Sequence, residues 1–213
     1  MKEIKDGIIN VELYKNSIPK VLWILKEGNV SEEDKNKERN ICNEINNGQH
    51  IDNALGIPTF RKMIYATYGI FNPDVSWEEI PLANNLESYN TFKNVGYINI
   101  NKMPGGQKSD YQIIQDAYLK YESFIIKQII DMKPNIIIFG GTYQFFTYEA
   151  CAIFGFDTRN VEKKYLQNGT VASIEVSNEK LVIDAYHPAY FRVSDKNYWY
   201  GIREAVMRWR NRG

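Results

Sequence analysis

The sequence has few cysteines and no long apolar run. Its 213 residues include two cysteines, Cys42 and Cys151, which are too few for a disulfide framework or a cysteine-ligated cluster. No run reaches the roughly 18 apolar residues that a transmembrane helix needs, and the charged start, residues 1–6, lacks the apolar core of a signal peptide. We therefore expect a cytoplasmic protein with no membrane partner.

An excess of charge of one sign is also missing. The chain has 26 Lys and Arg against 26 Asp and Glu, so its formal net charge is zero. This balance argues against binding to nucleic acid through overall charge alone. The charge is nevertheless segregated, because residues 184–213 contain six basic and three acidic residues, whereas residues 31–47 contain five acidic and three basic ones.

No repeat or low-complexity linker divides the chain. Hydrophobic residues make up 44% and charged residues 24% of the sequence, as in a globular protein that buries a core. We expect one domain over residues 1–213, with a charged insertion at about residues 31–49. Because this insertion contains so few apolar residues, we expect it to lie on the surface.

Apolar patterns predict alternating strands and helices. Five short apolar runs predict strands, the last two as a hairpin: 21–25, 95–100, 135–139, 171–176 and 181–185. Helical spacing predicts one helix over 58–69, one that follows a capping box at Ser109 and ends at Pro134, and one at the C-terminal end. This alternation predicts the α/β class, as a three-layer α/β/α sandwich with a central, mostly parallel sheet.

Polar residues follow three of the predicted strands, at 26–29, 99–106 and 186–192. In open sheets of this class the ligand site lies beyond the carboxyl ends of the strands. We therefore expect the three polar clusters to converge on one site.

The first and third clusters each contain a residue suited to catalysis. Glu27 is the one acid in the first cluster; it can stabilise an oxocarbenium-like sugar or position water, or it can be a surface acid paired with Lys26. In the third cluster, Pro188 restricts the backbone of His187 and fixes its direction. This His can donate a hydrogen bond to an oxygen that gains negative charge, or it can be a structural residue that caps a turn.

The second cluster begins with Asn99 at the end of its strand. The Asn99 amide offers a donor and an acceptor side by side, which can pair with the edge of a pyrimidine. The turn Pro104-Gly105-Gly106 exposes backbone N–H groups that a phosphate can approach. The alternative is an ordinary turn with a solvated Asn.

Together, in this order and spacing, the clusters resemble the uracil-DNA glycosylase superfamily over about residues 21–192. The segment His187-Pro188-Ala189 looks like the family's His-Pro-Ser/Ala motif, whose His supports the departing base at its O2. Asn99 looks like the strand-end Asn that reads the base. The resemblance therefore implies the uracil-DNA glycosylase fold for the single domain.

The resemblance also implies roles for the remaining candidates. Residues 26–29 stand in the place of the family's first motif, so that Glu27 or Asn29 is the catalytic residue that acts on water or the sugar. Phe60 stands where the family often has an aromatic ring that stacks on the extruded base. We expect contacts to the DNA backbone at four further residues: Lys102, Gly105, Gly106 and Arg192.

The sequence departs from the family after the first motif. No Pro-Tyr-His follows it, although that Tyr blocks a 5-substituent in the best-known uracil enzymes, and the four cysteines of the iron–sulfur branch are missing. We therefore expect a wider pocket for a damaged or 5-modified pyrimidine, for which the modified bases of invading phage are one source. The alternative is that Tyr186 or Tyr190 fills this space from elsewhere in the fold.

These features predict a monofunctional DNA glycosylase. It would hydrolyse the N-glycosidic bond of a flipped-out uracil, damaged base or 5-modified pyrimidine and leave an abasic site. We expect no cofactor and no metal, DNA as the partner, and a monomer. Two alternatives stay open: a non-catalytic module that binds a modified base or DNA on the same fold, and a nucleoside or nucleotide N-glycosidase, which the neutral net charge would suit.

Overall fold

The computed structural model describes residues 1–106, 108–155, 163–166, 169 and 171–211. Nine strands occur in the described part of the chain: β1 (Ile4–Lys5), β2 (Gly7–Ile8), β3 (Val21–Leu25), β4 (Arg39–Asn40), β5 (Gly96–Asn99), β6 (Ile136–Gly140), β7 (Lys164–Leu166), β8 (Val171–Ser177) and β9 (Lys180–Ala185). Seven α-helices accompany them there: α1 (Val11–Asn16), α2 (Ile41–Asn46), α3 (Pro58–Phe71), α4 (Leu86–Phe92), α5 (Tyr111–Met132), α6 (Tyr148–Ile153) and α7 (Asp195–Arg210). Three short 3-10 turns lie between them: η1 (Glu32–Asp34), η2 (Trp77–Glu79) and η3 (Tyr143–Phe145).

A seven-stranded sheet forms the centre of the molecule, in the order β2-β5-β3-β6-β9-β8-β7. The four middle strands, β5, β3, β6 and β9, are parallel. At one edge β2 pairs antiparallel with β5, and at the other β8 pairs antiparallel with both β9 and β7. All five predicted strands are therefore confirmed, including the hairpin of β8 and β9. The prediction of a mostly parallel central sheet is also confirmed.

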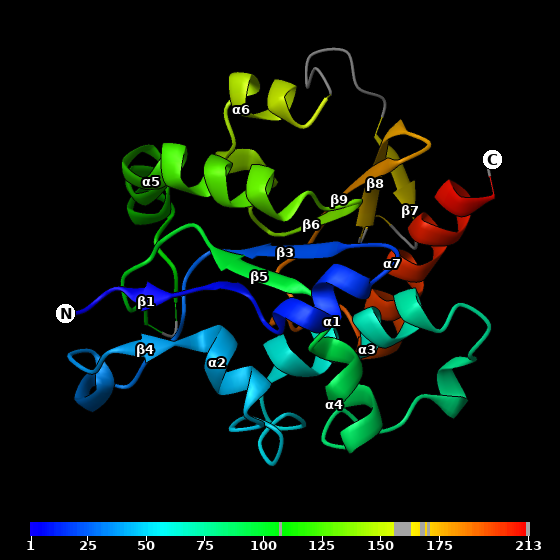
Figure 1. Cartoon of the computed structure of the whole chain (residues 1–213), viewed down its shortest axis with the longest axis horizontal. Helices are drawn as coiled ribbons and strands as arrows, with labels where there is room; N and C mark the ends of the chain where they lie inside the picture. Colours follow the sequence, from blue (N-terminus) through cyan, green and yellow to red (C-terminus); the bar gives the residue numbers. More distant parts are fainter. Residues whose placement is uncertain (107, 156–162, 167–168, 170, 212–213) are drawn as a thin grey trace.

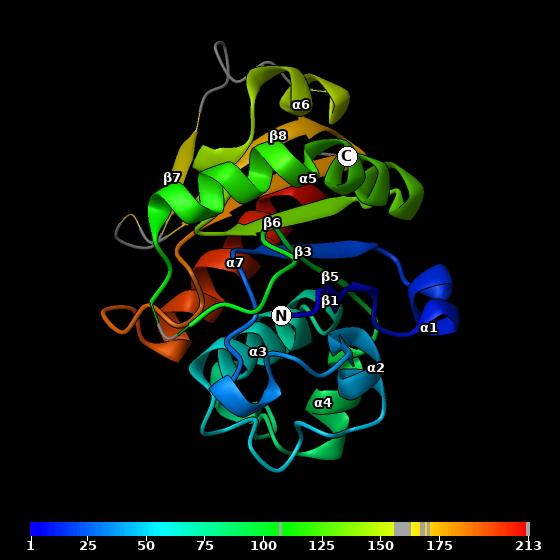
Figure 2. The same cartoon turned by 90° about the vertical axis from the view of Figure 1, so that its left-hand side faces the viewer.

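Helices cover both faces of this sheet. Figure 1 shows α5 and α6 on one side and α2, α3, α4 and α7 on the other, and the turned view in Figure 2 shows the same arrangement. The sequence of strand β3 accounts for helices on both faces, because all five of its residues are buried and alternate residues face opposite cores. Trp23 packs in the core beneath α3 and α7, whereas Leu22 and Ile24 pack beneath α5. An apolar strand without polar alternation is typical of a sheet covered on both sides.

The carboxyl ends of the parallel strands lie in register. Leu25 at the end of β3 is opposite Asn99 at the end of β5, and Gly140 at the end of β6 is opposite Ala185 at the end of β9. The first strand of this set along the chain, β3, lies between the second and the third, β5 and β6. Strand order therefore reverses at β3, which is the point where open α/β sheets form a crevice for ligands.

The charged insertion at about residues 31–49 lies on the surface over residues 31–38, as expected, but residues 39–46 are anchored to the core. After η1, β4 pairs with β1 in parallel and leads directly into α2, which Asn40 caps by accepting a hydrogen bond from the Asn43 N–H. The three apolar residues of α2, Ile41, Cys42 and Ile45, are buried. They occupy one face of the helix, so a short apolar stripe is enough to anchor this polar segment to the core.

The three predicted helices are confirmed, with small changes at their ends: α3 ends at Phe71 rather than at residue 69. Helix α5 begins at Tyr111, and its cap is Asp110, whose carboxylate accepts from the N–H groups of Gln112 and Ile113. The capping box expected at Ser109 is therefore wrong by one residue, because Asp is an equally good cap. Within the described residues, no helix is both long and apolar enough to cross a membrane.

Candidate active site

A pocket of about 320 Å³ lies beyond the carboxyl ends of β3 and β5. It brings together side chains from all three polar clusters, and its volume is at the lower end of small-molecule sites, roughly 300–1,000 Å³. Six of the sequence-predicted residues line it: Glu27, Asn29, Phe60, Asn99, Gly106 and His187. The three polar clusters therefore converge on one pocket, as expected.

His187 follows β9 and lies at one side of the pocket. The backbone N–H of Ala189 donates to its Nδ1 at 3.2 Å, so in the neutral ring the proton resides on Nε2. Burial and, to a smaller extent, the positive charges of Lys26 and Lys62 together lower the pKa of His187 to about 4. His187 is therefore neutral at pH 7 and has an Nε2–H group available to donate.

The loop that carries His187 fits closely against the end of β6. Gly141 has a φ of +70°, and a Cβ at this position would lie 3.1 Å from the His187 backbone nitrogen. Its N–H donates to the carbonyl oxygen of Ala185 at 2.7 Å. Glycine is required here both for the left-handed backbone and for the close approach of the loop.

Lys62 anchors the same loop through hydrogen bonds. This residue of α3 is 3% exposed, and its ammonium donates to the carbonyl oxygens of Tyr190 at 2.8 Å and Val193 at 2.7 Å. Between these two anchors the chain projects Phe191 and Arg192 into solvent. Lys62 is thus a positioning residue for the segment 190–193, which sequence reasoning did not identify.

The charge of Lys26 should influence the titration of His187. We expect Lys26→Gln to raise the pKa of His187 from about 4, because it removes a nearby positive charge that disfavours the imidazolium. The His187 ring protons report this in an NMR pH titration. Lys20→Gln, at the opposite end of β3, is the matched control and should leave the pKa unchanged; an equal effect of both variants would contradict the assignment.

Glu27 lies on the loop after β3, which runs beside the loop after β5. The Asn101 amide donates to Oε2 of Glu27 at 3.0 Å. Gly105 touches the carboxylate so closely that a Cβ there would be 2.2 Å from the Glu27 Cδ. Asn29 also lines the pocket but is exposed, and it pairs with Gly105 through a β-bridge. The more buried and better oriented of the two candidates in the first motif is therefore Glu27.

Asn99 ends β5 and is 2% exposed. Its Oδ1 accepts from the Tyr97 hydroxyl at 3.3 Å, which directs the amide nitrogen away from Tyr97. Its backbone N–H donates to Oδ2 of Asp6 at 2.8 Å. With its carbonyl occupied, Asn99 presents a hydrogen-bond donor to the pocket, as pairing with a carbonyl of a base would require.

Lys102 and Gly105 are not placed to contact a DNA backbone, contrary to expectation. The Lys102 ammonium is 3% exposed and donates to both carboxylate oxygens of Asp6 at 2.9 Å and to Gln128 at 2.9 Å. The Gly105 N–H is also occupied, since it donates to the carbonyl oxygen of Gly28 at 2.8 Å. Both residues therefore support the site through other residues: Lys102 binds Asp6, and Gly105 packs on Glu27.

The remaining candidates for backbone contacts, Gly106 and Arg192, are exposed. Arg192 lies with its guanidinium 5.6 Å from the centre of the Phe191 ring. Other basic residues of the C-terminal segment are engaged within the protein: Arg203 bonds the Pro73 carbonyl and Arg210 the Ile70 carbonyl. Arg212 lies outside the described residues. Among the described residues, the local basic excess therefore does not form a free cationic stripe.

Three pocket residues in or directly after the insertion were missed. Phe60 on α3 lines the pocket as predicted, and its ring packs 4.9 Å from that of His50. Arg39, Ile41 and His50 line the same pocket. The helical spacing of Ile41 and Ile45 was the signal that this segment returns to the core.

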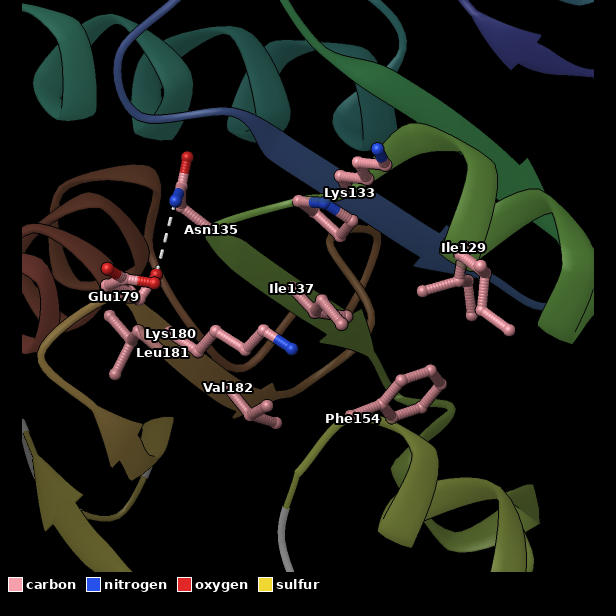
Figure 3. A pocket seen from close by; sticks show the side chains of 11 residues that line it. Ile129, Lys133, Asn135, Ile137, Phe154, Glu179, Lys180, Leu181 and Val182 are labelled. Carbon is pink, nitrogen blue, oxygen red and sulfur yellow. Dashed lines mark hydrogen bonds between the residues drawn. The ribbon is translucent and has the colours of Figure 1, made fainter.

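A second hollow of about 450 Å³ lies at the opposite, amino ends of β6 and β9 (Figure 3). Its lining is mostly apolar, with Ile137 and Val182 at its centre. The Asn135 amide there donates to the carbonyl oxygen of Glu179 at 3.2 Å. None of the residues singled out from the sequence lines this hollow, so it is separate from the candidate site.

The chain matches no protein-family model and no curated protein sequence. In the part of the chain that the structure describes, no group of three or more His, Cys, Asp or Glu side chains could hold a metal ion. The pocket offers carboxylate, amide and imidazole groups through Glu27, Asn99 and His187.

Proposed function

We propose that the protein is a monofunctional DNA glycosylase of the uracil-DNA glycosylase type, which hydrolyses the bond between a flipped-out pyrimidine and its sugar. The observation that carries this proposal is the convergence of Glu27, Asn99 and a neutral His187 on one pocket. Release of free base from a modified oligonucleotide is the experiment that tests it.

The proposed mechanism gives each of the three residues one task. Asn99 donates to the O4 of the base, and the Nε2–H of His187 donates to O2. As the glycosidic bond breaks, its electron pair moves to the base, and negative charge develops on O2, where His187 stabilises it. Glu27 stabilises the positive charge of the sugar or orients the water that attacks C1′.

The environment of His187 supports this role. The pKa of about 4 keeps the ring neutral, so it binds without adding a cation to the resting pocket. The charges of Lys26 and Lys62, which lower this pKa, also favour negative charge on a departing base. Both effects act more strongly in a site that excludes water.

The position of Phe191 supports duplex DNA as the partner, in which the stacked bases must be separated before one is flipped out. Its side chain is 83% exposed, and Phe191 comes four residues after the pocket residue His187. Apolar side chains inserted between bases are a common means of unstacking a duplex. In the proposed complex Phe191 occupies the place that the flipped nucleotide leaves.

We expect Phe191→Ala to lower base release from a matched duplex by about tenfold or more, because stacking of a base on an aromatic ring contributes roughly 1–3 kcal/mol. Release from a single strand should change little, since no partner base must be unstacked there. Single-turnover rates on both substrates provide the comparison. Equal losses on duplex and single strand would show that Phe191 is not a wedge.

Asn99→Asp should change which base is accepted. The substitution replaces the amide donor by an acceptor, so release of a base with O4 should fall at least about a hundredfold, while a base with an amino group at that position is tolerated better. Competition between uracil and cytosine oligonucleotides measures the change. Tyr97→Phe, which removes the hydroxyl that orients Asn99, should relax the preference to a smaller extent; an unchanged base spectrum in N99D would refute the assignment.

A further inference from the structure

Three side chains, Arg39, Glu44 and His50, form a polar side of the pocket that we call the Arg39 wall. The Arg39 Nε donates to Oε1 of Glu44 at 2.9 Å, and its Nη2 donates to Oε2. The Nε2 of His50 lies 3.1 Å from the same Oε2. Arg39 and His50 line the pocket, whereas Glu44 lies behind them. Glu44 is therefore a positioning residue for the two groups that face the cavity.

The wall offers the cavity the remaining N–H groups of Arg39, whose positive charge is balanced by the Glu44 carboxylate. Burial raises the pKa of the Glu44 carboxyl, but the hydrogen bonds from Arg39 and His50 outweigh burial and bring the pKa to about 2. Glu44 is thus ionised and neutralises one positive charge. The forked contact uses two N–H groups of the guanidinium, and among the described residues no further acceptor bonds it. The other N–H groups of Arg39 remain for a ligand.

Asn99, which would read the base, lies between His187 on one side of the pocket and the Arg39 wall on the other. Strand order places the β5 end and the β9 end on opposite sides of β3. Helix α2 docks at the β5 side, where the Cys42 thiol contacts the carbonyl oxygens of Gly7 at 3.3 Å and Tyr97 at 3.8 Å. Across the pocket the order is therefore His187, Asn99, Arg39.

This order matches the edge of a pyrimidine. A ring held at O2 by His187 and at O4 by Asn99 turns C5 toward Arg39, because C5 adjoins C4 on the side away from O2. Tyr186 and Tyr190, the aromatic residues that could fill this space, instead line the neighbouring hollow and stack on each other at 4.7 Å. The space beside C5 is thus bounded by the Arg39 guanidinium, which has N–H groups to donate.

We propose that Arg39, held by Glu44 and His50, reads a hydrogen-bond-accepting oxygen on the 5-substituent of the base. The substrate class is then a pyrimidine with O4 and an uncharged, oxygen-bearing 5-substituent such as hydroxymethyl or formyl. A methyl group would leave the guanidinium desolvated without a partner, and a carboxylate would meet a wall already neutralised by Glu44. This inference rests on the proposed function and names its substrate.

The test compares three oligonucleotides of one sequence that carry uracil, thymine or 5-hydroxymethyluracil. The native protein should release 5-hydroxymethyluracil faster than thymine by at least about tenfold, the range expected for one hydrogen bond to a charged group. Arg39→Met should abolish this ratio, with the rate on uracil measured for each protein as the reference. Arg208→Met, an exposed arginine of α7 paired with Glu204, is the control and should keep the ratio.

Three outcomes would overturn the inference. A ratio that survives Arg39→Met means that Arg39 does not read the substituent. An equal loss on all three bases means that Arg39 contacts the phosphate or supports the fold instead. Faster release of 5-carboxyuracil than of 5-hydroxymethyluracil by the native protein would mean that the wall selects an anion.

Equilibrium binding keeps the inference testable apart from catalysis. If the native protein releases no base, uracil included, the proposed function has failed, and binding of the same oligonucleotides then decides the role of Arg39. Tighter binding of the 5-hydroxymethyluracil strand than of the thymine strand supports the inference, and equal binding overturns it. The same comparison with the native protein applies if Arg39→Met does not fold.

Discussion

His187→Ala is expected to lower base release at least about a hundredfold, the loss typical of removing one donor to a developing oxyanion. The protein should still fold, because the His187 ring lines the pocket and its one described side-chain hydrogen bond is with the nearby Ala189 N–H. Single-turnover release of base at pH 7, with circular dichroism of the variant, measures both effects.

His187→Gln is the matched control for this result. Its amide can donate from a position close to Nε2, so its activity should lie between that of the native protein and His187→Ala. A folded His187→Ala protein with near-native activity would remove His187 from the mechanism.

The low pKa of His187 also makes a prediction for stability that does not depend on function. The group ordinarily titrates at 6.5 but at about 4 in the fold, so the unfolded state takes up the proton first. Stability contributed by the neutral ring is therefore complete above pH 6.5 and is lost as the pH falls toward 4. Chemical denaturation of the native protein and His187→Gln at pH 7 and pH 5 should show a smaller loss in the variant.

Glu27→Gln is the second substitution with a large expected effect. It should slow the chemical step by at least about a hundredfold and change DNA affinity little, because a carboxylate that stabilises the sugar cation acts mainly in the transition state. Glutamine preserves the size of the side chain beside Gly105, so the loss would reflect charge. Binding by anisotropy and turnover of bound DNA separate the two effects.

Asn29→Ala supplies the comparison for Glu27. Asn29 is exposed and lies on the same loop, and its loss should affect turnover less than Glu27→Gln does. If Glu27→Gln weakens binding and bound DNA still turns over at the native rate, Glu27 is a binding residue and Asn29 becomes the catalytic candidate of the first motif.

The sequence was sufficient to predict the sheet and the edge at which the site lies. Uniformly apolar runs such as 21–25 and 136–139 are buried on both sides, which specifies parallel central strands. The carboxyl ends of those strands then locate Glu27, Asn99 and His187 together. These inferences depend on local pattern and on the geometry of parallel sheets.

The missed features depend on contacts between distant parts of the chain. Lys102 was expected to face DNA, but Asp6, 96 residues away, binds its ammonium inside the protein. Lys62 bonds carbonyl groups 128 and 131 residues further on. No local pattern encodes such pairs. The Arg39 wall was missed for a different reason: the many charged residues of this segment obscure the helical spacing of Ile41 and Ile45.

The central claim is that this pocket breaks the N-glycosidic bond of a base in DNA. Incubation with oligonucleotides that carry uracil and several 5-modified pyrimidines, followed by mass spectrometry of the released bases, tests it most directly. We expect free base and an abasic strand from at least one of these substrates, with neither product from His187→Ala at matched times. Tight binding without any free base would contradict the claim in favour of a binding module, and release from free nucleosides alone would contradict it in favour of a nucleoside N-glycosidase.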